Sequence, residues 1–128
     1  MSQPLFSIIT ITYNAATTLP PTLRSVESQT FTNYEYIVVD GASKDNTVAL
    51  VEASTLQARM VSEPDKGLYD AMNKGLKMAT GEYLIFLNAG DAFHTPDTLQ
   101  GIADAMATVA PEWCMAKQLL SMPSATFL

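Results

Sequence analysis

Polar residues that could bind a metal ion, a phosphate or a ribose follow four separate apolar stretches of this sequence. The four groups are Tyr13 and Asn14; Asp40, Gly41 and Ser43; Glu63, Asp65 and Lys66; and Asn88, Gly90 and Asp91. In an open α/β sheet, ligands bind at the carboxyl ends of the parallel strands. If the apolar stretches are such strands, the sequence predicts one ligand site built from all four groups.

Asp91 is the strongest candidate for a metal ligand. It closes a glycine-containing loop, Asn88-Ala89-Gly90-Asp91. A carboxylate there suits a hard cation such as Mg²⁺ or Mn²⁺, which proteins often share with substrate phosphates. The alternative is an Asx turn, in which the carboxylate of Asp91 accepts a hydrogen bond from its own backbone. The spacing alone leaves both interpretations open.

Four other residues allow both a functional and a structural interpretation. Asp40 could accept a hydrogen bond from a base or a ribose, or could hold a turn or cap the next helix. Lys66 could reach a phosphate, although most lysines lie on solvated surface. His94 follows Asp91 closely, but a surface or capping role competes with a ligand role. Cys114 has no partner motif and is predicted to be an inert thiol.

The segments that must position these residues alternate between two hydrophobic patterns. Runs of β-branched and aromatic residues predict buried strands at 5–12, 34–40, 58–62 and 82–87. Helical spacing and capping residues predict helices at about 17–29, 45–51, 68–79 and 95–109. This alternation predicts an α/β fold with a parallel sheet covered by helices on both faces.

The predicted helix at 68–79 has an apolar stripe at helical spacing. We expect its core face to consist of Leu68, Met72, Leu76 and Ala79. We also interpret Tyr69 and Met78 as core residues rather than as parts of a site.

Composition and charge exclude several classes of function. Apolar residues make up 48% of the 128 residues, and 7 Lys+Arg against 13 Asp+Glu give a net charge of −6. An acidic chain without a basic run is a poor partner for nucleic acid. A single cysteine excludes an intrachain disulfide. We recognise no signal peptide and no membrane span, and we expect a cytoplasmic protein; a peripheral membrane contact stays open for a full-length relative.

Four segments, in this order, resemble the family 2 glycosyltransferases. They are Ser7–Asn14 (SIITITYN), similar to the family's opening strand; Ser28–Phe31 with Glu35–Thr47, similar to its second strand and turn; Asp65–Gly75 (DKGLYDAMNKG) with Ala79–Tyr83, similar to the helix before the central strand; and Phe86–Asp91 (FLNAGD), at the place of the metal-binding acidic motif. The match covers residues from about 6 to 100. Each motif is moderately specific, and their order makes the resemblance strong.

The resemblance implies a GT-A fold, which is a Rossmann-like three-layer sandwich, and a nucleotide-diphosphate-sugar donor, commonly a UDP-sugar. It implies Mg²⁺ or Mn²⁺ as the cofactor, with Asp91 as the metal ligand. It assigns nucleotide-sugar binding to Thr12, Tyr13, Asn14, Asp40, Ser43, Asp65, Lys66, Asp70 and Asn88. The implied acceptor is a saccharide or a lipid-linked molecule, and the implied setting is surface polysaccharide biosynthesis.

The sequence departs from the family pattern at two places. Many members carry a pair of acidic residues after the second strand, whereas here Asp40 is followed by Gly41. Many also carry several aspartates in the metal loop, whereas here Asn88 and Gly90 leave Asp91 alone. Fewer carboxylates imply weaker metal binding, more water ligands or a shifted donor preference.

The region after the metal loop differs more strongly. Family members are similar in using an acidic general base well beyond that loop; Asp97, Asp104 and Glu112 do not match its position, so the catalytic residues are unknown. We expect residues 1–110 to form the nucleotide-sugar-binding subdomain and 111–128 an atypical tail. Because a one-base shift of the reading frame permits a family-like strand there, we hypothesise that the tail is frameshifted and the domain C-terminally truncated.

Three functions remain to be compared. The chain could be a glycosyltransferase, or an inactive nucleotide-binding fragment that lacks the acceptor half and self-associates through its exposed truncated face. It could also be a nucleotide-binding α/β domain of another class. That class needs a phosphate-binding glycine-rich loop after the first strand, whereas residues 13–17 contain no glycine. The third function is therefore ranked lowest.

Overall fold

Four strands alternate with four helices in the protein's structure, a computed structural model that describes residues 4–108. The elements are β1 (Phe6–Thr12), α1 (Leu19–Glu27), β2 (Tyr34–Asp40), α2 (Thr47–Ala53), β3 (Arg59–Ser62), α3 (Leu68–Met78), β4 (Tyr83–Phe86) and α4 (Thr98–Thr108). The predicted alternation is confirmed. The predicted tail at 111–128, with Cys114 and Glu112, lies outside the described residues. Among the helices described here, none is long and apolar enough to cross a membrane.

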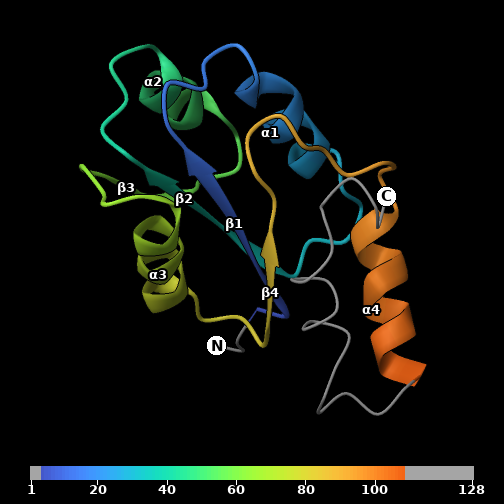
Figure 1. The fold of residues 1–128 in the computed structure, drawn as a ribbon. Coiled ribbons are helices and arrows are strands. Elements are labelled where there is room, and N and C mark those ends of the chain that lie inside the picture. The colour runs from blue at the N-terminus through green and yellow to red at the C-terminus, as the bar shows by residue number, and fades with distance from the viewer. Residues whose placement is uncertain (1–3, 109–128) are drawn as a thin grey trace.

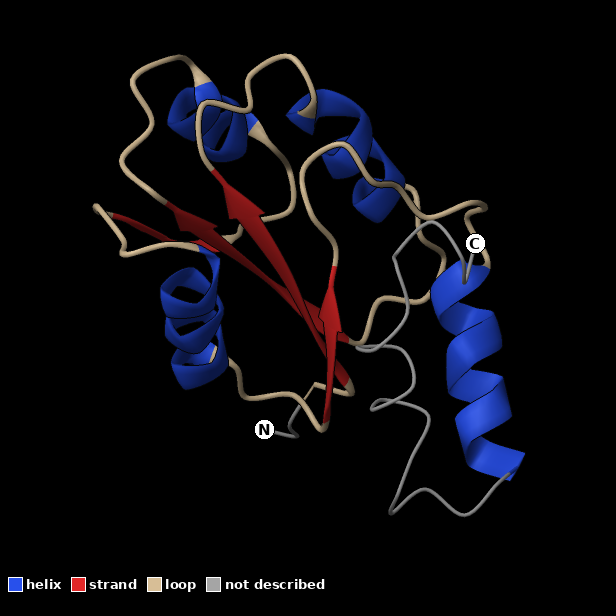
Figure 2. Cartoon of the chain, in the orientation of Figure 1, coloured by secondary structure: helices blue, strands red, loops and turns tan. Residues whose placement is uncertain are grey.

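The strands form one parallel sheet in the order β3-β2-β1-β4 (Figure 2). The register pairs Thr12 with Asp40, and Asp40 with Ser62. Three neighbouring strands therefore end at the same level, and their last side chains lie side by side. The predicted α/β class with a parallel sheet is confirmed.

Both faces of the sheet are covered by helices (Figure 1). On one face Phe6 and Ile8 of β1 pack with residues of α1, α2 and α4. On the other face Ile9 packs with Ile37, Val39 and Ala71 of α3. Alternate residues of β1 thus supply two cores, as expected for a strand that is buried on both sides.

The expected core face of α3 is wrong for its leucines and for Tyr69, whereas Met78 and Ala79 do pack against the core. Leu68 and Leu76 are 56% and 42% exposed, and Tyr69 is 81% exposed, whereas the buried residues of α3 are Ala71 and Gly75. The helix lies so close to the sheet that a Cβ on Gly75 would come within 2.7 Å of Ile9 Cγ2. Small residues permit this close approach, so Ala71 and Gly75 rather than the two leucines lie against the sheet.

Two helical glycines are expected to respond oppositely to alanine. In Gly75→Ala the clash with Ile9 outweighs the gain in helix propensity, and we expect stability to fall by about 1–3 kcal/mol. At Gly101 on α4 a Cβ would meet no atom of the described residues within 4 Å, apart from its chain neighbours and its own helix backbone, so Gly101→Ala is expected to raise stability by about 0.5–1 kcal/mol. Urea unfolding of both variants checks this, and a stabilised Gly75→Ala would contradict the packing of α3.

Helix α1 begins after a threonine, within the predicted range, but the threonine does not cap the helix through its side chain. Thr18 is the N-cap residue and makes no side-chain capping bond. A capping oxygen accepts from the N–H of the second or third helical residue, and here those residues are Pro20 and Pro21, which have no N–H. The prolines set the start of the helix by their fixed φ angle instead.

Helix α4 starts at Thr98, later than the predicted start at Thr95, because Gln29 takes over its first hydrogen bonds. Gln29 is buried; its Nε2 donates to the carbonyl of Thr95 at 2.7 Å, and its Oε1 accepts from the N–H of Leu99 at 2.9 Å. In a helix starting at Thr95 these two backbone groups would bond to each other. Gln29 therefore ties the end of α1 to the start of α4.

The amino-terminal edge of the sheet is held by a cluster around Glu35. Its carboxylate accepts hydrogen bonds from Ser7 Oγ at 2.5 Å, from the N–H of Thr80 at 2.6 Å and from Arg59 Nη1 at 2.9 Å. Burial opposes ionisation, but the bonds from Ser7, Thr80 and Arg59 lower the pKa of Glu35 below its ordinary value. The N–H of Gly81 donates to Ser7 Oγ at 2.7 Å. The Thr80-Gly81 motif is thus structural and lies opposite the candidate site.

Candidate nucleotide-binding site

The loops that follow β1 and β2 are joined by hydrogen bonds through Asn14. The N–H of Asn14 donates to Ser43 Oγ at 2.7 Å, and Asn14 Oδ1 accepts from the N–H of Lys44 at 2.8 Å. Asn14 has φ 48°, a left-handed conformation that asparagine tolerates better than most residues. One residue later, the N–H of Ala15 donates to Thr47 Oγ1 at 2.8 Å. The two strand ends are therefore one connected backbone unit.

Asp40 lies at the centre of this unit, and its carboxylate accepts hydrogen bonds from three neighbouring segments. Oδ1 accepts from Thr12 Oγ1 at 2.7 Å and from Ser43 Oγ at 2.5 Å, while Oδ2 accepts from the N–H of Ser43 and from Ser62 Oγ, both at 2.8 Å. A carboxylate offers about four acceptor positions. Asp40, which is fully buried, thus has each position occupied by the protein itself.

The ionisation of Asp40 follows from these contacts. Burial raises the pKa of a carboxyl group, but the hydrogen bonds from Ser43, Thr12 and Ser62 more than offset this and lower the pKa of Asp40 below its ordinary value of 3.8. Asp40 is therefore a carboxylate at neutral pH. The sequence left two roles open for Asp40, ligand binding and holding a turn. The hydrogen bonds from Ser43 to its carboxylate are those of a residue that holds a turn.

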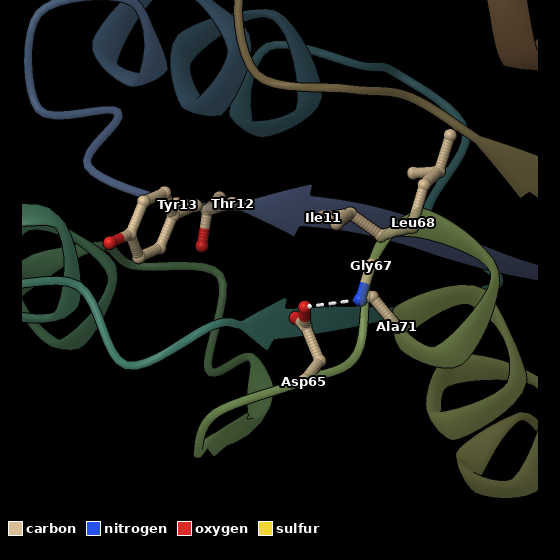
Figure 3. A pocket seen from close by; sticks show the side chains of 7 residues that line it. All are labelled: Ile11, Thr12, Tyr13, Asp65, Gly67, Leu68 and Ala71. Carbon is tan, nitrogen blue, oxygen red and sulfur yellow. Dashed lines mark hydrogen bonds between the residues drawn. The ribbon is translucent and has the colours of Figure 1, made fainter.

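An open pocket of about 330 Å³ lies beside the end of β1. Figure 3 shows its lining: the Tyr13 ring lies past the end of β1, Gly67, Leu68 and Ala71 come from the start of α3, and the Asp65 carboxylate lies between these two sides. The remaining lining residues are Ile11 and Thr12. The pocket therefore combines an exposed aromatic ring, an apolar wall and one carboxylate.

Gly41 makes room for the Asp65 carboxylate. A Cβ at position 41 would lie 2.9 Å from Asp65 Oδ2 and 3.4 Å from Tyr13 Cδ1. The other carboxylate oxygen, Oδ1, accepts from the N–H of Gly67 at 3.2 Å. Glycine stands here where the family resemblance suggests a second acidic residue, and its lack of a side chain leaves room for the carboxylate of Asp65.

The start of α3 is shaped by hydrogen bonds to its backbone. Gly67 adopts φ 120° and ψ −175°, a conformation open essentially to glycine. The carboxylate of Asp70 accepts from the N–H of Lys66 at 2.9 Å and lies 3.7 Å from Lys74 Nζ. Asp70 therefore serves the local structure, whereas the exposed ammonium group of Lys66 makes no hydrogen bond or ion pair within the described residues.

The loop after β4 is held by its backbone, while its acidic side chain is free. The N–H of Asp91 donates to the carbonyl of Asn88 at 3.0 Å, and Gly90 has φ 98°. Thr22 Oγ1 accepts from the N–H of Gly90 at 2.9 Å and donates to the carbonyl of Asp91 at 2.6 Å. Within the described chain no group donates to the carboxylate of Asp91, so the predicted Asx-turn alternative does not describe this residue.

The residues at this loop fit a divalent cation that is shared with a phosphorylated ligand. Within the described part of the chain no three His, Cys, Asp or Glu side chains gather into a metal cluster. Mg²⁺ is commonly held by one or two carboxylates together with water and substrate phosphates. The unengaged, half-buried carboxylate of Asp91 can supply such a contact, with the exposed amide of Asn88 beside it in the loop. His94 is exposed and makes no such cluster.

The structure thus sorts the predicted site residues into four groups. Thr12, Tyr13 and Asp65 line the pocket; Asn14, Asp40 and Ser43 join the strand ends; Lys66 and Asp70 lie at the start of α3; Asn88 and Asp91 lie in the loop after β4. The sequence reasoning missed Thr22, Gln29, Thr47 and Ser62, which hold these loops by side-chain hydrogen bonds. For Gln29 a signal was available, since it lies in the Ser28–Phe31 segment that resembles the family.

Two solved structures with a fold similar to that of this chain contain a bound nucleotide-sugar. The chain matches the mannosyltransferase PcManGT from Pyrobaculum calidifontis, solved in complex with GDP-Man and Mn²⁺, with a TM-score of 0.76 and 28% identity over 87% of this chain and 34% of that chain. It matches S. aureus TarS 1-349 in complex with UDP-GlcNAc with a TM-score of 0.73 and 29% identity over 80% of this chain and 31% of that chain. The fold is that of the GT-A glycosyltransferases.

The sequence model of Glycosyl transferase family 2 matches residues 7–111. The chain therefore belongs to this family, and the resemblance found in the sequence is confirmed.

Curated relatives of the chain are named as sugar transferases. A PGL/p-HBAD biosynthesis glycosyltransferase of Mycobacterium bovis (strain BCG / Pasteur 1173P2) is 43% identical over 107 residues, which are 80% of this chain and 42% of the relative. The Escherichia coli UDP-Glc:alpha-D-GlcNAc-diphosphoundecaprenol beta-1,3-glucosyltransferase WfgD is 38% identical over 93 residues, 71% of this chain and 37% of the relative. The chain spans less than half the length of these relatives.

Proposed function

We propose that this chain binds a nucleoside-diphosphate-sugar, specifically a UDP-sugar, and serves in transferring the sugar to a saccharide or lipid-linked acceptor during glycan assembly. The observation that carries the proposal is the open pocket at the end of β1, with Tyr13 on one side and Asp65 between Tyr13 and the start of α3. Membership of the glycosyltransferase family supports it.

The nucleoside end of the donor would occupy this pocket. Tyr13 is 61% exposed, and an exposed aromatic ring gives a nucleobase a surface on which to stack. Asp65 supplies an acceptor for a base N–H or a ribose hydroxyl. Asp40 would hold Thr12, a lining residue of the pocket, in place rather than bind the nucleoside, because its own acceptor positions are filled by Thr12, Ser43 and Ser62.

The diphosphate end would meet Asp91. Its carboxylate, with Asn88 nearby in the loop, would hold Mg²⁺ or Mn²⁺ against the phosphates. The cation would neutralise the charge that develops on the departing diphosphate. The free ammonium group of Lys66, exposed at the start of α3, is a second candidate for a phosphate contact.

Relatives support the choice of nucleotide without fixing it. WfgD is named for a UDP-Glc donor and a diphosphoundecaprenol-linked acceptor, and TarS was solved with UDP-GlcNAc. PcManGT was solved with GDP-Man. We favour uridine because the UDP-dependent relative WfgD is 38% identical to this chain, whereas PcManGT is 28% identical.

Nucleotide binding without sugar transfer is the second candidate. Its support is that we assign no general base among the described residues. An assay that measures the release of UDP from UDP-glucose or UDP-GlcNAc, with a lipid-linked saccharide as the acceptor, distinguishes the two candidate functions. Turnover would exclude the second, whereas UDP binding without turnover would favour it.

Removing the Tyr13 ring is expected to weaken UDP binding by about tenfold, because stacking of a base on an aromatic ring contributes roughly 1–3 kcal/mol. Calorimetric titration of UDP into Tyr13→Ala checks this. The matched control is Tyr69→Ala, which removes a ring that is 81% exposed but does not line the pocket. Equal binding by wild type and Tyr13→Ala, or equal losses in both variants, would contradict the placement of the base.

A further inference from the structure

The hydroxyl group of Thr22 makes its hydrogen bonds outside its own helix. Thr22 lies inside α1 and is fully buried. A helical hydroxyl usually bonds back to a carbonyl of its own helix, as Ser25 Oγ does to the carbonyl of Thr22 at 2.8 Å. The hydroxyl of Thr22 instead forms hydrogen bonds with the backbone of the loop after β4.

Both bonds of this hydroxyl go to the residues that would present the metal ligand. It accepts from the N–H of Gly90 at 2.9 Å and donates to the carbonyl of Asp91 at 2.6 Å. Accepting one bond and donating the other fixes the direction of the hydroxyl hydrogen. The backbone on both sides of the Gly90–Asp91 peptide is thereby tied to α1.

The flanks of the loop are fixed as well. Leu87 is fully buried, Phe93 is 5% exposed, and Gly90 itself holds φ 98°. The backbone of this loop is thus anchored at both ends and held in the middle by Thr22. The carboxylate of Asp91 is left without a hydrogen bond among the described residues and is available to a ligand.

We infer that Thr22 is a positioning residue for metal-dependent donor binding, which rests on the function proposed above. The described residues hold no group of three or more His, Cys, Asp or Glu side chains that could bind a metal ion, so a cation at this loop would rely strongly on Asp91. Its affinity therefore depends on how well the backbone of that residue is held. Thr22 acts through Asp91 and need not touch the cation or the donor.

The test compares Thr22→Val, which keeps the shape and removes the hydroxyl, with Thr22→Ser, which keeps the hydroxyl. We expect Thr22→Val to weaken UDP binding in Mn²⁺ by about tenfold or more and to leave UDP binding in EDTA unchanged. Thr22→Ser should bind within about twofold of wild type in Mn²⁺. Undiminished Mn²⁺-dependent binding by Thr22→Val would overturn the inference.

A matched control separates this effect from general destabilisation. Ser7 is also fully buried, and its hydroxyl also accepts from a glycine N–H, that of Gly81, and donates to a carboxylate, that of Glu35. It lies at the opposite edge of the sheet. Ser7→Ala should lose stability but retain Mn²⁺-dependent binding. An equal loss of binding in Ser7→Ala would show that Thr22 acts through stability alone and would overturn the inference.

Hydrogen exchange of the Gly90 amide, followed by NMR, gives a readout that needs no nucleotide. We expect it to be slow in wild type and Thr22→Ser and at least about tenfold faster in Thr22→Val. If wild type shows no Mn²⁺-dependent UDP binding, the proposed function fails, and equal Gly90 exchange in all three proteins would overturn the role of Thr22 separately. If Thr22→Val does not fold, Thr22→Ser decides: retention of both properties supports the role, and their loss overturns it.

Discussion

Asp91→Asn is expected to abolish the Mn²⁺-dependent part of UDP binding, lowering the affinity in Mn²⁺ by at least about tenfold, or about 1.4 kcal/mol. The change keeps the shape of the side chain and removes its charge. No described residue donates to this carboxylate, and the described residues hold no group of three or more His, Cys, Asp or Glu side chains that could bind the cation instead. Calorimetric titration of UDP in Mn²⁺ and in EDTA measures the effect.

The matched control for this change is Asp104→Asn, which removes one negative charge from an exposed position on α4. Its binding should equal that of the wild type in both buffers. Asp91→Asn should in turn equal the wild type in EDTA. An Asp91→Asn protein that still gains affinity from Mn²⁺ would show that the metal is held elsewhere.

Asp40→Asn is expected to lower the free energy of unfolding by about 2–4 kcal/mol. The amide replaces one carboxylate oxygen by an NH₂ group, which cannot accept the hydrogen bonds that reach that oxygen. The donors on Thr12, which is buried, and on Ser43 and Ser62 would then lack a full set of partners. Urea unfolding at pH 7 measures the loss, and Asp45→Asn, at an exposed carboxylate in the same loop, should lose less.

The pH dependence follows from the lowered pKa of Asp40. A carboxyl group with a lower pKa in the folded state stabilises the fold above its unfolded pKa of about 3.9, and this stabilisation is lost as the pH falls through the folded value. The difference between wild type and Asp40→Asn should therefore be largest near pH 7 and shrink below about pH 4. A difference that is constant with pH, or equal losses in the Asp40 and Asp45 variants, would contradict the central role of Asp40.

The strands and the strand-end residues could be predicted from the sequence because their signal is local. Apolar β-branched runs such as the one before Tyr13 stop where polar residues begin. Parallel pairing then brings Thr12, Asp40 and Ser62 to one level. The predicted parallel order of the strands was therefore enough to predict a candidate site at the carboxyl ends of the strands.

The face of α3 could not be predicted because apolar periodicity favours the larger side chains. Leu68 and Leu76 have the spacing of a core stripe, yet the helix approaches the sheet through Ala71 and Gly75. How closely a helix approaches a sheet depends on which small residues face it. That information lies in the contact between Gly75 and Ile9 and not in the helix sequence by itself.

The residues that hold the loops could not be predicted because their partners are distant in the sequence. Thr22 bonds to Gly90 and Asp91, and Gln29 bonds to Thr95 and Leu99. A threonine or a glutamine inside a helical stretch has no pattern that names such a partner. Asp40 also has partners that are distant in the sequence, Thr12 and Ser62. The sequence therefore left two roles equally open for Asp40, ligand binding and holding a turn.

The most direct test of a donor site at the carboxyl edge of the sheet is paramagnetic broadening of the chain's amide NMR signals by Mn²⁺ in the presence of UDP. We predict that the signals of Gly90 and Asp91 broaden most, followed by those of Tyr13 and Gly67, while Thr80 and Gly81 at the opposite edge stay sharp. Without UDP the broadening should be weaker, since the phosphates complete the coordination. Broadening centred on the opposite edge, or none that depends on UDP, would contradict the account.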